Sequence, residues 1–88
     1  MASYRVRLKA SAAKEVESIQ PKKVRLQIVE RIRRLSEDPR PSGCEKLAGR
    51  SDRYRVRQGD YRIVYSIADE ALIVLVVKVG HRGSVYRR

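Results

Sequence analysis

An uninterrupted apolar run from Ala71 to Val77 constrains the fold of this chain more than any other segment. The run is far shorter than the roughly 20 residues that a membrane-spanning helix needs, and it is rich in β-branched valine and isoleucine. It therefore predicts a strand from about Leu72 to Val79. Because its apolar residues do not alternate with polar ones, we expect an inner strand that is covered on both faces or lies against helices.

Two short turns connect this run to the strands that precede it. Gln58-Gly59-Asp60 separates an expected strand at Arg53–Arg57 from another at Tyr61–Ile67, and Asp69-Glu70 then leads into the apolar run. Two tight turns in succession predict an antiparallel meander.

The N-terminal half predicts one strand and two helices. Tyr4–Leu8 alternates at a period of two, which predicts a first strand. Ser11 is a candidate N-cap for a helix that ends near Glu17, and a second helix should run from about Lys22 to Glu37. We expect the helical hairpin to pack on one face of a small, mainly antiparallel sheet, so that residues 1–88 form a single α+β domain.

The charge of the chain points to anionic partners. Its 21 lysines and arginines face only 10 aspartates and glutamates, which gives a formal net charge of +11. A field of this sign attracts polyanions and speeds their encounter. Nucleic acid or an acidic protein that masks the charge are therefore the expected partners, and simple solubility is the third interpretation.

The single cysteine and the N-terminal segment indicate the cellular compartment in which the protein works. Cys44 is the only cysteine, so no internal disulfide forms and no second cysteine is available for a metal site. The first residues alternate like a strand and lack the apolar stretch of a signal peptide. We expect a cytoplasmic protein with no membrane contact.

Arginines are concentrated on two of the expected strands. Arg53, Arg55 and Arg57 share one face at a spacing of about 7 Å, an arrangement that favours a polyanion lying along them. The alternative is an edge strand protected by charge against aggregation. Arg62 stands inside an otherwise apolar strand, where it either meets an anion or is a partly buried arginine satisfied by backbone carbonyls.

The C-terminal segment carries the remaining candidate groups. His81 is the only histidine and can exchange a proton near neutral pH, Arg82 offers a fork of donors to phosphate, and Tyr86 offers a hydroxyl and a flat face. A surface histidine and arginine near a frayed end is the alternative. In so basic a chain, the group favours phosphodiester chemistry on nucleic acid.

Five segments in this order resemble one protein family. They are Leu35-Ser36-Glu37-Asp38-Pro39-Arg40-Pro41, Lys46-Leu47-Ala48-Gly49, Tyr54-Arg55-Val56-Arg57, Gly59-Asp60-Tyr61-Arg62-Ile63-Val64-Tyr65, and Val79-Gly80-His81-Arg82 with Val85-Tyr86. Together they resemble the RelE/ParE superfamily of type II toxins, and the C-terminal part is closer to the RelE branch. The resemblance implies a RelE-like fold and an mRNA endoribonuclease that acts in the ribosomal A site and is held inactive by an antitoxin.

The resemblance also implies a set of site residues. The catalytic positions fall on Arg55, Arg57, Arg62, Arg82 and Tyr86, with His81 alongside. We expect further RNA contacts from Lys46, Arg53, Lys78 and Arg87, and neither a metal nor a cofactor. Some relatives have lysines where this chain has Arg55 and Arg57, and arginine effectively cannot lose its proton. The base that activates the ribose 2′-hydroxyl is therefore expected to be His81, with Tyr86 second because tyrosine ordinarily titrates near pH 10.

Two other functions remain open on the sequence. A ParE-like inhibitor of DNA gyrase has the same fold, and a plain RNA-binding module needs only the basic face. The expected partners of the leading interpretation are an acidic, partly disordered antitoxin, the ribosomal A site with its rRNA, and mRNA.

Overall fold

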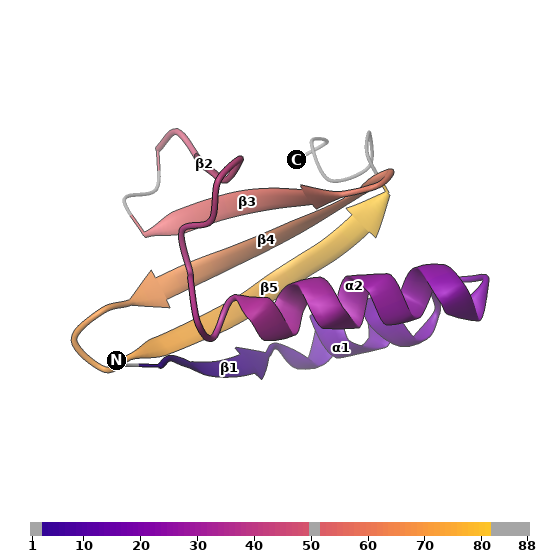
Figure 1. Cartoon of the computed structure of the whole chain (residues 1–88), viewed down its shortest axis with the longest axis horizontal. Coiled ribbons are helices and arrows are strands. Elements are labelled where there is room, and N and C mark those ends of the chain that lie inside the picture. The colour runs from indigo at the N-terminus through magenta and orange to yellow at the C-terminus, as the bar shows by residue number, and fades with distance from the viewer. Residues whose placement is uncertain (1–2, 50–51, 82–88) are drawn as a thin grey trace.

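The computed structural model describes residues 3–49 and 52–81, which form two helices and five strands. In chain order these are β1 (Arg5–Leu8), α1 (Ala10–Glu17), α2 (Lys22–Arg34), β2 (Glu45–Lys46), β3 (Arg53–Gln58), β4 (Tyr61–Ala68) and β5 (Ile73–His81) (Figure 1).

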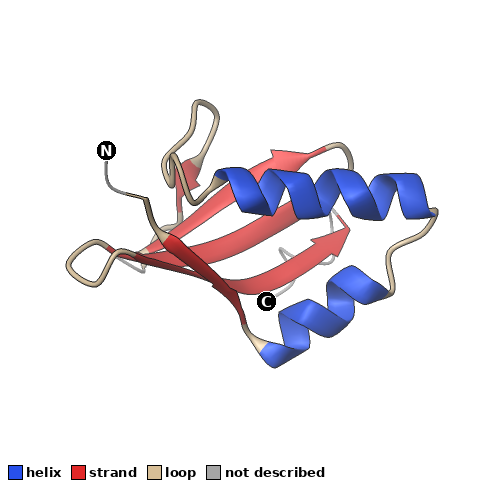
Figure 2. Ribbon diagram, turned by 60° about the horizontal axis from the view of Figure 1, so that its bottom comes forward, coloured by secondary structure: helices blue, strands red, loops and turns tan. Residues whose placement is uncertain are grey.

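The strands form one mixed sheet in the order β1-β5-β4-β3-β2. β1 runs parallel to β5, and the other three pairs are antiparallel. Both helices lie on the same side of the sheet (Figure 2). The expected α+β fold, with a helical hairpin on a mainly antiparallel sheet, is confirmed.

The hydrophobic core lies between the helices and the inner face of the sheet. Ile28, Ile32 and Leu35 meet a sheet face built around Tyr65 and Val76, and all five side chains are buried. Within residues 3–49 and 52–81, no helix covers the opposite face of the sheet.

A register shift between Val64 and Tyr65 changes which residues of β5 face the core. Val74 and Val76 are buried, but the next buried residue is Val79, three positions later. An extra residue in one strand has this effect, because every following side chain changes face. β5 thus lies against the helices on one face only, which was one of the two arrangements expected for it.

Three details differ from the sequence-based expectations. Ser11 lies inside α1 and does not cap it: the N-cap residue is Lys9, without a side-chain hydrogen bond. The Lys9 N–H donates to Val76 O, so the sheet pairing continues up to the first residue of the helix. The helix α2 ends at Arg34 rather than Glu37, and the short strand β2 was not expected.

None of the helices in the described residues is long and apolar enough to cross a membrane.

Candidate functional site

The sheet face opposite the helices brings three of the predicted arginines together. Val56 is buried in the core, so its neighbours Arg55 and Arg57 point to the outer face. Arg57 is also the register partner of Arg62 on β4. Directly opposed residues of an antiparallel pair point to the same side, so Arg62 joins this outer face.

These three arginines line a small cleft of about 130 Å³. We call it the arginine cleft; its lining residues are Gly43, Glu45, Arg55, Arg57 and Arg62. Three guanidinium groups in so small a space form a strong site for an anion, because arginine is charged at any physiological pH and its donors match phosphate oxygens.

A carboxylate also belongs to the arginine cleft. Glu45 on β2 is the register partner of Arg55 on β3, and the two side chains form an ion pair. The Glu45 side chain is 63% exposed and that of Arg55 is 20% exposed. Sequence reasoning missed Glu45, since a strand of two residues leaves no periodic pattern that would place it beside β3.

Gly43 directs the chain into the arginine cleft. Its φ of 91° lies in the left-handed region that glycine adopts without strain. The turn closes with a hydrogen bond from Cys44 N–H to Pro41 O, 3.0 Å between nitrogen and oxygen. Glu45 and the pairing with β3 follow immediately.

His81 does not share the face of the clustered arginines. It is the register partner of Tyr61, and the two rings meet edge to face with centroids 5.5 Å apart. Tyr61 packs against the core, so His81 lies on the side of the sheet opposite Arg62. The backbones do converge as expected, since Gly80 is the register partner of Arg62.

The remaining sequence candidates are dispersed. Lys78 Nζ lies 2.8 Å from Glu15 Oε2 on α1, in an ion pair away from the arginine cleft. Lys46 is exposed and is the register partner of Tyr54, on the face opposite Glu45. Arg53 shares the face of Arg55 but pairs with Ser66, further along β4. Arg82, Tyr86 and Arg87 lie outside the described residues.

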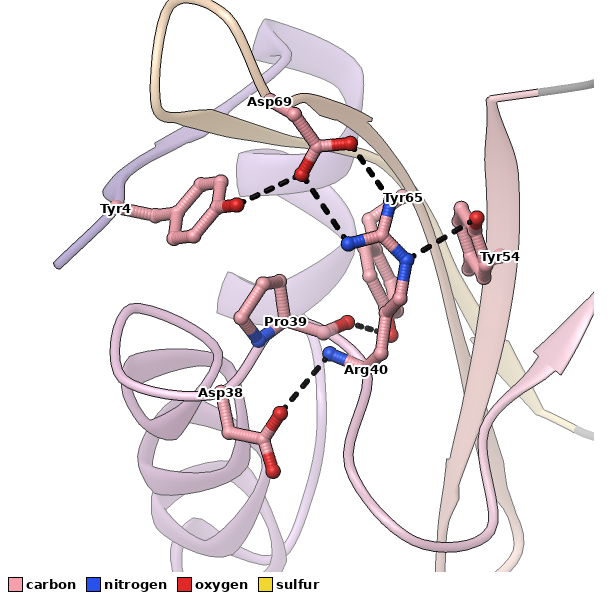
Figure 3. Close-up of polar contacts among 7 residues, drawn as sticks. All are labelled: Tyr4, Asp38, Pro39, Arg40, Tyr54, Tyr65 and Asp69. Carbon is pink, nitrogen blue, oxygen red and sulfur yellow. Dashed lines mark hydrogen bonds and ion pairs between the residues drawn. The ribbon is translucent and has the colours of Figure 1, made fainter. Parts of the chain in front are cut away.

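A second polar cluster lies at the other end of β3 and β4, and sequence reasoning did not single it out (Figure 3). The Arg40 guanidinium donates to both carboxylate oxygens of Asp69, at 3.1 and 2.8 Å. Tyr4 Oη donates to the same carboxylate at 2.7 Å, and Arg40 also reaches Tyr54 Oη at 3.2 Å. The cluster ties the loop after α2 to the start of the chain and to the β4–β5 turn.

Hydrogen bonding and burial shift two pKa values in this region, in opposite directions. The hydrogen bonds from Arg40 and then Tyr4 lower the pKa of Asp69 to about 2. Burial raises the pKa of Tyr65 above its usual range, and its hydroxyl donates to Pro39 O at 2.7 Å. These groups serve the architecture, because they join segments distant in sequence and are separate from the arginine cleft.

Comparisons with known proteins agree with this arrangement. A sequence model of the family described as the ParE toxin of the type II toxin-antitoxin system, parDE, matches residues 6–86. Toxin RelG of Mycobacterium tuberculosis is 28% identical over 85 residues, which cover 97% of this chain and 98% of the relative. The mRNA interferase toxin RelE of Escherichia coli K12 is 38% identical over 61 residues, 67% of this chain and 63% of that toxin. The archaeal RelE–RelB complex from Pyrococcus horikoshii OT3 contains a chain that superposes with a TM-score of 0.81 at 31% identity, covering 92% of this chain and 97% of its own.

Proposed function

Because the chain belongs to the RelE/ParE superfamily of type II toxins, we propose that it is a metal-independent endoribonuclease that cleaves mRNA in the ribosomal A site and so inhibits translation. The observation that carries this proposal is the arginine cleft, in which Arg55, Arg57 and Arg62 converge on the sheet face that neither α1 nor α2 covers. A phosphodiester backbone is the polyanion that such a face fits.

The chemistry needs three contributions from the protein. The 2′-hydroxyl of the ribose attacks the adjacent phosphorus, so a base must take its proton, cations must stabilise the phosphorane, and the 5′-oxygen must leave with a proton. We assign Arg62 to the scissile phosphate, together with Arg82 from the C-terminal segment. Arg55 and Arg57 track the backbone, and Tyr86 stacks on a base.

A substitution of Arg62 tests the phosphate assignment. The Arg62→Ala variant should lose roughly 100-fold or more in the rate of mRNA cleavage in a translating extract, as is usual when one preorganised donor to a transition state is removed. Arg33→Ala is the matched control, because Arg33 is 73% exposed on α2, on the helical side of the molecule. A loss of less than threefold for Arg62→Ala would leave that arginine a structural role only.

The proton-transfer role that the sequence predicts for His81 has a variant of its own as its test. Its contact with Tyr61 keeps the ring on the helical side of the sheet, away from the arginine cleft. The His81→Ala variant decides the matter: undiminished mRNA cleavage in the translating extract would remove His81 from the reaction.

The gyrase inhibitor remains the second candidate, favoured by one observation. The family description that matches residues 6–86 is that of the ParE toxin. Expression of the chain, with mRNA 5′ ends mapped and gyrase supercoiling measured in the same cells, separates the functions. Codon-phased cuts support the endoribonuclease, loss of supercoiling supports the gyrase inhibitor, and neither result supports a plain RNA-binding module.

We further propose that an acidic antitoxin masks the basic surface in the cytoplasm. The net charge of +11 favours a partner of opposite charge, and the similar archaeal toxin was solved as a complex with RelB. Co-expression with the product of the adjacent gene should restore growth to cells that express the toxin. Continued growth arrest would exclude that product as the antitoxin.

A further inference from the structure

The described residues of the arginine cleft hold a single side chain that can accept a proton. Arg55, Arg57 and Arg62 remain protonated in proteins, and Gly43 has no side chain. His81 lies on the other side of the sheet. Glu45 is therefore the remaining candidate for the proton acceptor, and its carboxylate lies among the arginines that we propose to hold the scissile phosphate.

The backbone holds Glu45 in this position from both sides. Its strand pairs with β3 in fixed register, Glu45 opposite Arg55, and Leu47 N–H donates to Arg53 O at 2.9 Å. The turn at Gly43 fixes the approach before it. The ion pair with Arg55 orients the carboxylate toward the arginines while 63% of the side chain remains exposed, so a substrate can reach it.

We propose that Glu45 is the general base of the cleavage reaction, an inference that rests on the proposed endoribonuclease function. A Glu45 carboxylate oxygen takes the proton from the 2′-hydroxyl of the scissile nucleotide. The 2′-oxygen forms its bond to phosphorus as the bond from phosphorus to the 5′-oxygen breaks. The 5′-oxygen takes a proton from water, and Glu45 returns its own proton to solvent, so the products are a 2′,3′-cyclic phosphate and a 5′-hydroxyl.

Because Glu45 is exposed, a substitution at this position can test catalysis without disturbing the fold. An ion pair as exposed as this one adds little to the free energy of folding, so the Glu45→Gln variant should fold like the native chain. Circular dichroism and thermal unfolding check this directly. The glutamine keeps the size of the side chain and a hydrogen-bond acceptor for Arg55 but is not a base.

The test measures single-turnover cleavage of mRNA on programmed ribosomes and, separately, binding of the toxin to those ribosomes. Glu45→Gln should lower the cleavage rate by about 100-fold or more, the usual range for a lost general base, with ribosome binding changed less than about twofold. Glu45→Asp should retain part of the activity. Glu70→Gln, the same change of charge in the turn between β4 and β5, should cleave like the native chain.

The pH profile distinguishes a base from a residue that only positions Arg55. Among the described residues, the charged groups facing Glu45 are Arg55 and Arg57 from β3 and Arg62 from β4, and arginine side chains keep their charge in proteins. The native rate should therefore fall on the acidic side as Glu45 becomes protonated. That dependence should persist in His81→Ala and disappear from the residual activity of Glu45→Gln.

Three results would overturn the role of Glu45 while leaving the endoribonuclease function in place. Cleavage by Glu45→Gln within threefold of the native rate excludes a base at this position. Faster cleavage would instead make Glu45 a competitor of the phosphate for Arg55. An acidic dependence unchanged in Glu45→Gln would assign the base elsewhere, with Tyr86→Phe as the next variant. Failure of the native chain to cleave mRNA on these ribosomes would instead reject the endoribonuclease function itself, and with it the role of Glu45.

Discussion

At the residue scale, Asp69 connects pH to the stability of the fold. Its carboxylate accepts hydrogen bonds from Arg40 and Tyr4, and these lower its pKa from the ordinary 3.8 to about 2. A carboxyl group whose pKa is lower in the folded chain stabilises that chain above its unfolded pKa, and the gain disappears as the pH falls through the folded pKa. The contribution of Asp69 is therefore complete above about pH 4 and lost near pH 2.

The Asp69→Asn variant tests this linkage. At pH 7 the variant should unfold at a lower urea concentration than the native chain, because it lacks the charge that Arg40 pairs with. The difference should shrink between about pH 4 and pH 2 as the native carboxylate becomes protonated. Urea titrations across this range measure it. A difference independent of pH would mean that the variant loses packing rather than charge.

The candidate site could be predicted from the sequence only in part. Arginines at every second position of β3 must lie on one face of the sheet. The short turn between β3 and β4 then makes Arg57 the register partner of Arg62. The face of His81 could not be predicted, because the register shift at Val64 and Tyr65 reverses every later side chain of β5. Without the shift, His81 would lie on the face of the arginine cleft.

At the element scale, α1 completes the exposed edge of β5. The parallel partner β1 pairs only with residues Ile73 to Val76 of that strand. Beyond Val76, Glu15 of α1 supplies the hydrogen-bond acceptor for this edge. One of its carboxylate oxygens accepts from Val79 N–H at 2.8 Å, and the other accepts from Lys78 Nζ at 2.8 Å. A side chain of the helix thus replaces the missing strand and fixes α1 against the sheet.

Removal of Glu15 should therefore weaken the whole fold. We expect Glu15→Ala to lower the free energy of unfolding by about 1–3 kcal/mol, because a charged acceptor is lost and a partly buried N–H is left unpaired. Glu17→Ala is the control on the same helix, since Glu17 is exposed. Lys78→Met should cost less than about 1 kcal/mol, as its ion pair is half exposed. Urea unfolding measures all three, and equal effects of Glu15→Ala and Glu17→Ala would contradict this role.

The elements that could be predicted are those with a long periodic pattern or a tight turn. The second helix and the meander of β3, β4 and β5 belong to this group. The sequence predicts an end of α2 near Glu37 because Leu35 continues the apolar pattern of the helix, whereas the helix ends at Arg34 and Leu35 is its C-cap residue. The strand β2 depends on tertiary pairing with β3 alone, and two residues carry no pattern of their own.

At the scale of the whole molecule, charge is divided between two sides. The helical side pairs part of its charge locally: Glu30 of α2 contacts both Arg33 and Arg34. On the opposite sheet face, Glu45 is the one carboxylate among the described residues that line the arginine cleft, where it faces three arginines. A net charge of +11 attracts polyanions from any direction, whereas the proposed function places RNA specifically at the arginine cleft.

This difference predicts which arginines set the salt dependence of RNA binding. Each phosphate neutralised on a single strand contributes about −0.7 to the slope of log K against log salt concentration. Arg57→Gln, at an exposed position of the arginine cleft, should reduce the steepness of the slope by roughly that amount, whereas Arg33→Gln should leave it unchanged. Binding of a 2′-O-methyl RNA oligonucleotide, which cannot be cleaved, measures the slope between about 50 and 200 mM salt. An equal reduction by both variants would mean that the salt dependence of RNA binding reflects the total charge of the molecule. The sheet face that carries the arginine cleft would then not be the RNA-binding surface.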